Sequence, residues 1–135
     1  MDGQYITLEG AKNLPNYRYH SSDPSLVYNY FLSPLADFLV SKMPESISPN
    51  CITLCGHFCI LGLYLLCITY CYSCTLPSWL IYTCGCLYFA WLILDNMDGK
   101  QARRTGTSSP LGLIFDHQVD ALNTWMTSTL MGVLF

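Results

Sequence analysis

Charged residues are almost absent from the middle of this sequence. Between Cys51 and Leu94 there is no Asp, Glu, Lys or Arg, and charged residues make up only 11% of the chain. A soluble domain usually carries about 25%. Because a membrane-spanning helix needs ~20 apolar residues, the stretch is long enough for two passes, with a turn at 75–78, where the sequence reads Thr-Leu-Pro-Ser. A buried helical hairpin in a soluble protein is the alternative.

Other common signals are also missing. The first fifty residues have no basic start and no early apolar block, so no secretory signal peptide is predicted. Cys51, Cys55 and Cys59 share one helical face, but the usual zinc patterns, two CxxC motifs or a CxxC with HxxxH, are absent, since only one CxxC occurs, at 71–74. We interpret the cysteines as small, weakly polar residues of membrane helices. The net charge of −3 does not suggest a nucleic-acid partner.

The remaining pattern predicts an all-α, polytopic membrane protein. Residues 26–43 repeat apolar side chains at spacings of three and four, which is typical of an amphipathic helix. Such a helix just before a span suits the plane of the membrane interface, although a core-facing helix would show the same pattern. We therefore predict a cytosolic segment, 1–50, and a transmembrane region, 51–135. The predicted spans cover about residues 51–74, 78–95 and 111–135.

Basic residues predict the orientation in the membrane. Lys42 precedes the first predicted span. Lys100, Arg103 and Arg104 follow the second, whereas the turn between the two spans has no basic residue. The positive-inside rule therefore places the amino terminus and this basic group on the cytosolic side.

Four acids stand beside the last two predicted spans. Asp95 and Asp98 are three residues apart at the end of one helix, and Asp116 and Asp120 are four apart at the start of the next. Each pair projects from one side of its helix, and a short turn lets the pairs face each other. Four carboxylates would repel unless cations lay between them, and hard oxygen ligands favour Mg²⁺, Mn²⁺ or Ca²⁺. The alternative is helix-end charges paired with the neighbouring Lys and Arg residues.

The spacing of these residues matches a known signature. Residues 95–103 read D-N-M-D-G-K-Q-A-R, and Gly112, Asp116 and Asp120 follow, so every fixed position of D-x2-D-G-x2-A-R-x8-G-x3-D-x3-D is present. In this respect the chain resembles the CDP-alcohol phosphotransferase family.

The flanks resemble the choline and ethanolamine phosphotransferase branch of that family. The similar segments are K-Q-A-R-R-T at 100–105 and P-N-C-I-T-L-C-G at 49–56. Two positions differ, because Leu113 and Gln118 stand where that branch usually carries Glu and Gly.

The resemblance implies transfer of phosphocholine or phosphoethanolamine from CDP-choline or CDP-ethanolamine to diacylglycerol, with release of CMP. It implies an integral membrane enzyme of the endoplasmic reticulum or Golgi whose active site faces the cytosol, and it allows for a homodimer. Family members are much longer, so the alternative is a truncated, non-catalytic membrane protein or an incomplete gene model, which at most associates with a full-length enzyme. We expect no complete reaction from these 135 residues alone.

The resemblance also assigns roles to residues. Two Mg²⁺ or Mn²⁺ ions would be held by Asp95, Asp98, Asp116 and Asp120. The CDP-alcohol would bind at Asp95, Asp98, Gly99, Ala102, Arg103, Gly112 and Asp116. The catalytic acceptor of the hydroxyl proton would be His117 or Asp120.

Overall fold

The computed structural model of the chain describes residues 7–13, 25–70 and 77–134, and its regular elements are all helical there. In chain order they are α1 (Leu8–Asn13), the π-helix η2 (Tyr28–Leu32), α2 (Ser33–Lys42), α3 (Pro49–Tyr70), α4 (Ser78–Thr105) and α5 (Pro110–Leu134). The all-α prediction is confirmed.

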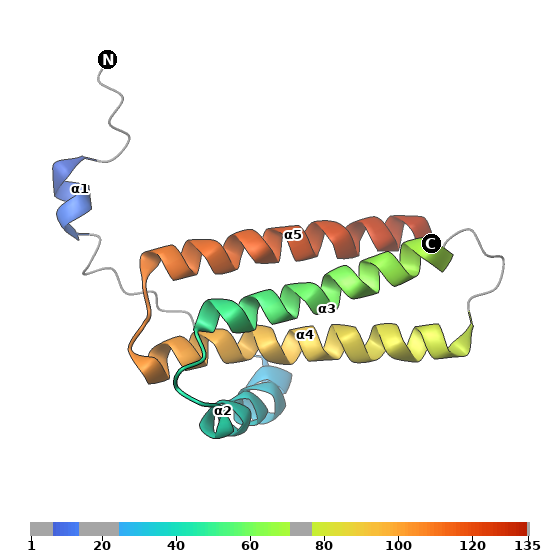
Figure 1. The fold of residues 1–135 in the computed structure, drawn as a ribbon, viewed down its shortest axis with the longest axis horizontal. Coiled ribbons are helices and arrows are strands. Elements are labelled where there is room, and N and C mark those ends of the chain that lie inside the picture. The colour runs from blue at the N-terminus through green and yellow to red at the C-terminus, as the bar shows by residue number, and fades with distance from the viewer. Residues whose placement is uncertain (1–6, 14–24, 71–76, 135) are drawn as a thin grey trace, which may run out of the picture.

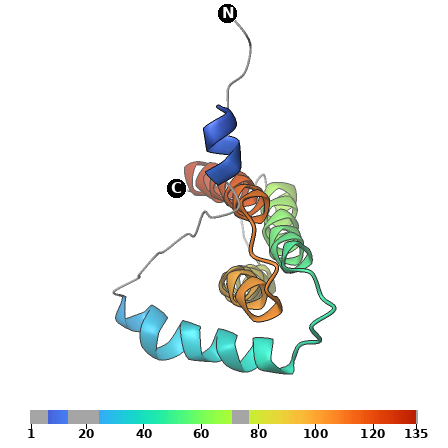
Figure 2. The same cartoon turned by 90° about the vertical axis from the view of Figure 1, so that its left-hand side faces the viewer.

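Three long helices run side by side, and a shorter one crosses them at one end. Figure 1 shows α3, α4 and α5 lengthwise with α2 seen end-on. Figure 2 looks along the three long helices and shows α2 crossing beneath α4. α4 and α5 each pack against α3, and α2 packs against α4. The arrangement therefore places α3 in contact with both helices that carry the predicted acids.

α3 and α4 are the described helices that are long and apolar enough to cross a membrane. In their most apolar windows only 33% of α3 and 11% of α4 is buried inside the protein. A core helix of a soluble protein would be mostly buried, so these surfaces favour lipid neighbours and disfavour the soluble hairpin. α5, the third predicted span, is not one of these two helices, and its crossing stays a prediction.

The helix boundaries differ from the expected ones mainly at α4. The second predicted span ends near residue 95, whereas α4 continues to Thr105. Asp95 and Asp98 therefore lie within the helix, and not at its end as predicted. The return of charge marks the end of the apolar stretch but not of the helix, because Lys, Gln, Ala and Arg are good helix formers. Gly106 ends α4 with φ 67°, a left-handed conformation that glycine adopts without strain.

Parts of the predicted turn and spans lie outside the described residues. These are residues 71–74 of the first span, residues 75 and 76 of the turn, and Phe135. α3 begins at Pro49, slightly earlier than predicted.

The predicted amphipathic helix at 26–43 is present, with a local widening. Pro34 has no backbone N–H, so the regular hydrogen-bond ladder cannot continue through it. The preceding turn widens to the π-helix η2, and the Ser33 N–H donates to the carbonyl of Tyr28. α2 then buries Ala36 and Val40 against the bundle. The large apolar side chains of this segment are exposed: Leu26, Val27, Tyr30, Phe31 and Phe38.

The two ends of the bundle have separate apolar cores. At the end next to α2, Ala36 and Val40 pack with Ile52 of α3 and Met97 of α4. At the other end the core contains Leu63, Cys67 and Leu130.

Between these ends, a Cβ added at Gly56 would lie 3.2 Å from Cδ1 of Trp91 and 3.6 Å from Cβ of Leu94. Glycine at this position therefore lets α3 and α4 approach closely beside the acids.

Candidate metal and substrate site

The predicted acidic pairs do face each other across α4 and α5. Carboxylate oxygens of Asp95, Asp116 and Asp120 all lie within 4.8 Å of one another, and we call these three residues the acid cluster. In the described parts of the chain this is the one such group of three or more His, Cys, Asp or Glu residues. Two oxygens on opposite sides of one Mg²⁺ ion lie about 4 Å apart. The acid cluster therefore suits a small divalent cation after slight adjustment.

Two oxygens of the acid cluster have no hydrogen-bond partner among the described residues. They are Oδ1 of Asp116 and Oδ1 of Asp120, and both are buried. Buried polar atoms are nearly always paired, so each of these oxygens needs an explanation. A cation between the helices would supply the missing partner, and the oxygen donor set fits Mg²⁺ or Mn²⁺.

The basic residues near the acid cluster pair elsewhere. Lys100 Nζ lies 2.7 Å from an oxygen of Asp37, and Arg104 lies 3.6 Å from Glu45. No Lys or Arg in the described ranges forms an ion pair with any of the four acids. The alternative interpretation, in which the acids are helix-end charges paired with these cations, is therefore wrong for Lys100 and Arg104.

Asp98 is held differently from the acid cluster. It is 6% exposed, and both of its oxygens accept hydrogen bonds, Oδ2 from the Thr53 hydroxyl and Oδ1 from the Gly99 N–H, each at 2.5 Å. Its side chain also interacts with Asp116, as Asp95 does with Asp120. A metal-ligand role for Asp98 stays a prediction. Thr53 was not predicted from the sequence as a residue of the site. Its hydroxyl, in the first turns of an apolar helix, could have indicated a polar partner.

The two candidates for the proton acceptor occupy different places. Asp120 belongs to the acid cluster. His117 lies beside it, with a 60% exposed side chain and Nδ1 3.8 Å from Oδ2 of Asp116. This distance is too long for a hydrogen bond. The structure thus brings Asp120 together with the other acids and leaves His117 at their edge.

The residues predicted to contact the CDP group neighbour the acids along α4 and α5: Gly99, Ala102, Arg103 and Gly112. A Cβ on Gly99 would lie 3.5 Å from a guanidinium nitrogen of Arg103, so this exposed side chain folds back over the glycine. A Cβ on Gly112 would lie 3.3 Å from Ser109 Oγ and 3.8 Å from Asn50 Oδ1. The start of α5 therefore lies against the start of α3.

A second polar contact between α3 and α5 was not expected from the sequence. His57 Nδ1 lies 2.8 Å from Asn123 Oδ1, and Asn123 is only 2% exposed. Each residue lies one helical turn beyond a residue of the site, His57 after Thr53 and Asn123 after Asp120. The sequence could have predicted this contact, because on both helices the polar residue follows a site residue by one turn.

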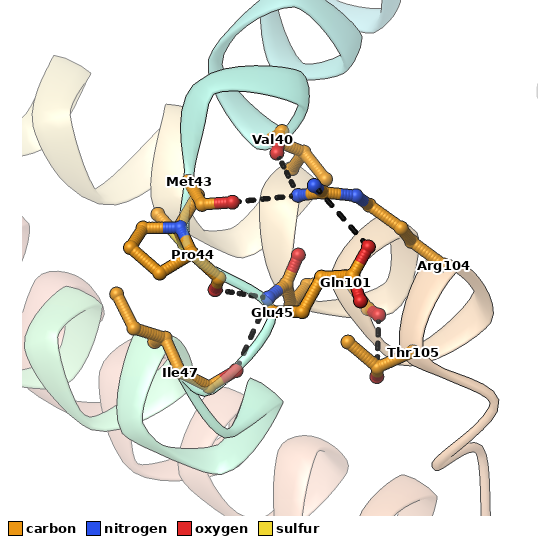
Figure 3. Close-up of polar contacts among 8 residues, drawn as sticks. All are labelled: Val40, Met43, Pro44, Glu45, Ile47, Gln101, Arg104 and Thr105. Atoms are coloured by element: carbon orange, nitrogen blue, oxygen red, sulfur yellow. Dashed lines mark hydrogen bonds and ion pairs between the residues drawn. The ribbon is translucent and has the colours of Figure 1, made fainter.

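The opposite side of the last turns of α4 contacts α2 and the α2–α3 connection (residues 43–48) (Figure 3). One guanidinium nitrogen of Arg104 donates to the carbonyls of Val40 and Met43, at the carboxyl end of α2. Lys100 donates to Ser33 Oγ at 2.8 Å. Lys100 therefore binds side chains of the first half of α2, and Arg104 binds carbonyls at its carboxyl end.

Comparison with known proteins agrees with this geometry. The sequence profile of the CDP-alcohol phosphatidyltransferase family matches residues 46–135. The chain is 42% identical over 130 residues, or 95% of its length, to "Uncharacterized CDP-alcohol phosphatidyltransferase class-I family protein 2" of Dictyostelium discoideum.

Two further relatives carry the name choline/ethanolaminephosphotransferase 1. The Arabidopsis thaliana protein is 41% identical over 122 residues, which is 87% of this chain. The Saccharomyces cerevisiae protein is 35% identical over 129 residues, which is 93% of this chain. The aligned region makes up 32%, 31% and 32% of the three relatives, so the chain spans about a third of their length.

Proposed function

The chain belongs to the CDP-alcohol phosphatidyltransferase family, and on that premise we propose that the acid cluster is its metal and CDP-alcohol site. The proposed reaction transfers phosphocholine or phosphoethanolamine from the CDP-alcohol to diacylglycerol and releases CMP. One observation carries the proposal. Three carboxylates from two helices converge, two of their buried oxygens lack a partner in the described residues, and the nearby Lys100 and Arg104 bind α2 instead.

Asp95, Asp116 and Asp120 would hold the divalent cations, Mg²⁺ or Mn²⁺, of which the family resemblance implies two, with Asp98 as the fourth acid. When bound, such ions neutralise the diphosphate and stabilise the charge that develops on the leaving group. The donor set fits this role, because carboxylate oxygens are the ligands these hard cations prefer.

The remaining site residues would bind and orient the nucleotide. Thr53 and the Gly99 N–H hold both oxygens of Asp98, so this carboxylate has a defined direction. The absence of side chains at Gly99 and Gly112 lets a phosphate approach the helix backbone. Arg103, which is exposed beside Gly99, offers a planar set of donors to phosphate oxygens.

In the proposed transfer, the hydroxyl oxygen of diacylglycerol forms a bond to the phosphorus that carries choline or ethanolamine. The bond from this phosphorus to the oxygen of CMP breaks, and CMP leaves with the electron pair. Asp120, inside the acid cluster, is favoured as the acceptor of the hydroxyl proton over the more exposed His117.

The placement of α2 supports a site at the membrane surface. α2 crosses the long helices at the end that carries the acids (Figures 1 and 2). Exposed large apolar side chains lie on α2 and on the turns before it: Leu26, Val27, Tyr30, Phe31 and Phe38. We place this face in the membrane interface. The basic residues near this end favour the cytosolic side. The family resemblance implies the membrane of the endoplasmic reticulum or Golgi. Diacylglycerol would then reach the acids from the bilayer.

Direct binding measurements test the proposal. The chain in nanodiscs of neutral lipid is titrated with labelled CDP-choline or CDP-ethanolamine, with Mn²⁺ or with a chelator. We expect nucleotide binding that requires the metal and is lost in Asp116→Asn. Nucleotide binding that persists in the chelator, or an Asp116→Asn variant that binds both ligands normally, would exclude this site.

A further inference from the structure

Gln101 is a fully buried polar residue that the proposed reaction does not use. Its side chain is 0% exposed, and it lies three residues after Asp98, about one turn further along α4. A polar side chain at such a depth is costly unless it is hydrogen-bonded. Its partners therefore indicate why a polar residue stands there.

Both partners of Gln101 Nε2 are backbone carbonyls of the α2–α3 connection, whereas Oε1 is buried without a partner among the described residues. Nε2 donates to the carbonyl oxygens of Pro44 and Ile47, each at 3.1 Å (Figure 3). An amide nitrogen carries two hydrogens, one for each carbonyl, whereas the flipped amide would place an oxygen against both. The Ile47 N–H also donates to the Pro44 carbonyl at 3.2 Å. Gln101 therefore bonds both ends of this turn to α4.

The α2–α3 connection leads directly into the part of α3 that meets the acids. α3 begins two residues after Ile47, and its first turns carry Thr53, whose hydroxyl donates to Asp98. Gln101 and Asp98 stand one turn apart on the same helix. Hydrogen bonds therefore join one short piece of α4 to this part of the chain at two points. One is in the connection just before α3 begins, and the other is at Thr53 within α3.

We propose that Gln101 is a positioning residue for the acid site, because it sets where the first turns of α3 lie relative to Asp98. Without its two hydrogen bonds the connection would move away from α4, and Thr53 would no longer direct Asp98. The inference rests on the proposed metal site. Residues that orient metal ligands typically affect metal affinity by about 10–100-fold.

The test is Mn²⁺ binding to the chain in neutral-lipid nanodiscs, followed by electron paramagnetic resonance. Gln101→Met keeps the length and helix propensity of the side chain but removes the donors. Glu45→Gln is the matched control in the same connection, since it removes only the exposed ion pair to Arg104. We expect about tenfold weaker Mn²⁺ binding in Gln101→Met, unchanged binding in Glu45→Gln, and the same helix content in both.

A double-mutant cycle with Thr53→Val separates positioning from a general structural role. If Gln101 acts through Thr53, the two substitutions together weaken Mn²⁺ binding no more than the stronger one alone. Amide hydrogen exchange over residues 43–53 is expected to speed up in Gln101→Met. If that variant fails to fold, Gln101→Asn, which keeps the amide on a shorter side chain, replaces it in every measurement.

Three outcomes would overturn the inference. In the first, the Gln101 variants bind Mn²⁺ as tightly as the unaltered chain. In the second, the effects of the Gln101 and Thr53 substitutions are fully additive, which would show that they act independently. In the third, the unaltered chain binds no Mn²⁺, which would remove the proposed function as well. The first two outcomes leave the metal site intact, so the two failures are distinguishable.

Discussion

The last turns of α4 present two sides of opposite character. One side carries Asp95 and Asp98 toward α5 and α3, and the other carries Lys100 and Arg104 toward α2. These acids and cations are close in sequence, yet the cations form their ion pairs and hydrogen bonds with α2 and with Met43 and Glu45 of the α2–α3 connection. The helix therefore separates its charges by side instead of neutralising them locally.

The two sides differ in how completely the protein satisfies them. On the α2 side, the donors of Lys100, Gln101 and Arg104 meet carbonyl, hydroxyl or carboxylate oxygens, and one buried oxygen, Oε1 of Gln101, has no partner among the described residues. On the acid side, like charges converge, and buried oxygens of Asp116 and Asp120 lack partners in the described part of the chain. Like charges in a low-dielectric site are unfavourable. This difference indicates that the α2 side holds the fold together, whereas the acid side needs a ligand from outside.

The largest expected effect comes from Asp95→Asn. Loss of a direct ligand should weaken Mn²⁺ binding by more than the 10–100-fold that is typical of an orienting residue. Because one of three converging charges disappears, the metal-free chain should also become more stable. Mn²⁺ titration and thermal unfolding in a chelator measure the two effects. A metal-free variant less stable than the unaltered chain would argue against charge repulsion on the acid side. Asp37→Asn, on the α2 side, serves as the control for Mn²⁺ binding.

Metal addition should itself stabilise the folded chain. At a free Mn²⁺ concentration of 100 times the dissociation constant, the gain in unfolding free energy is about 2.7 kcal/mol. Thermal unfolding with and without Mn²⁺ measures it, and Ca²⁺, which is larger, tests the selectivity of the site. The same unfolding temperature in Mn²⁺ and in chelator would mean that the acid side is complete without a ligand.

A smaller effect is expected at His57 and Asn123, further along the α3–α5 interface. Hydrogen bonds between membrane helices contribute about 0.6 kcal/mol on average and up to ~1.7 kcal/mol. His57→Leu should lower the unfolding free energy by about this amount, whereas His57→Asn should lose less, since its amide can still bond. A double-mutant cycle with Asn123→Leu measures the coupling. Zero coupling energy would show that the contact does not stabilise the interface.

The smallest effect is expected from the ion pair on the α2 side. The Asp37 side chain is 63% exposed, so the carboxylate end of its pair with Lys100 is in contact with water, although the Lys100 side chain is only 10% exposed. Such pairs contribute about 0.2–1 kcal/mol. Lys100→Met should therefore destabilise the chain slightly without weakening Mn²⁺ binding, as unfolding and titration would show. Weaker Mn²⁺ binding in this variant would break the separation of the two sides.

Much of the site could be predicted from the sequence because helical periodicity is a local property. The spacing of Asp116 and Asp120 places both carboxylates on one side of any α-helix, and the same holds for Asp95 and Asp98. The apolar stretch likewise predicted α3 and α4, and the spacing at 26–43 predicted the amphipathic helix around Pro34. The predicted end of the second long helix, near residue 95, was wrong, because charged residues replace apolar ones there while the backbone stays helical to Thr105.

Partners distant in the sequence were decided only by the tertiary structure. Thr53 bonds to Asp98 across 45 positions, and Gln101 bonds to Pro44 across 57. Local propensity says nothing about which side of one helix meets another, because packing sets the register between helices. The sequence alone therefore determined which helices form and which acids share a side. Only packing decided that the cations contact α2, leaving the acid cluster without their charge.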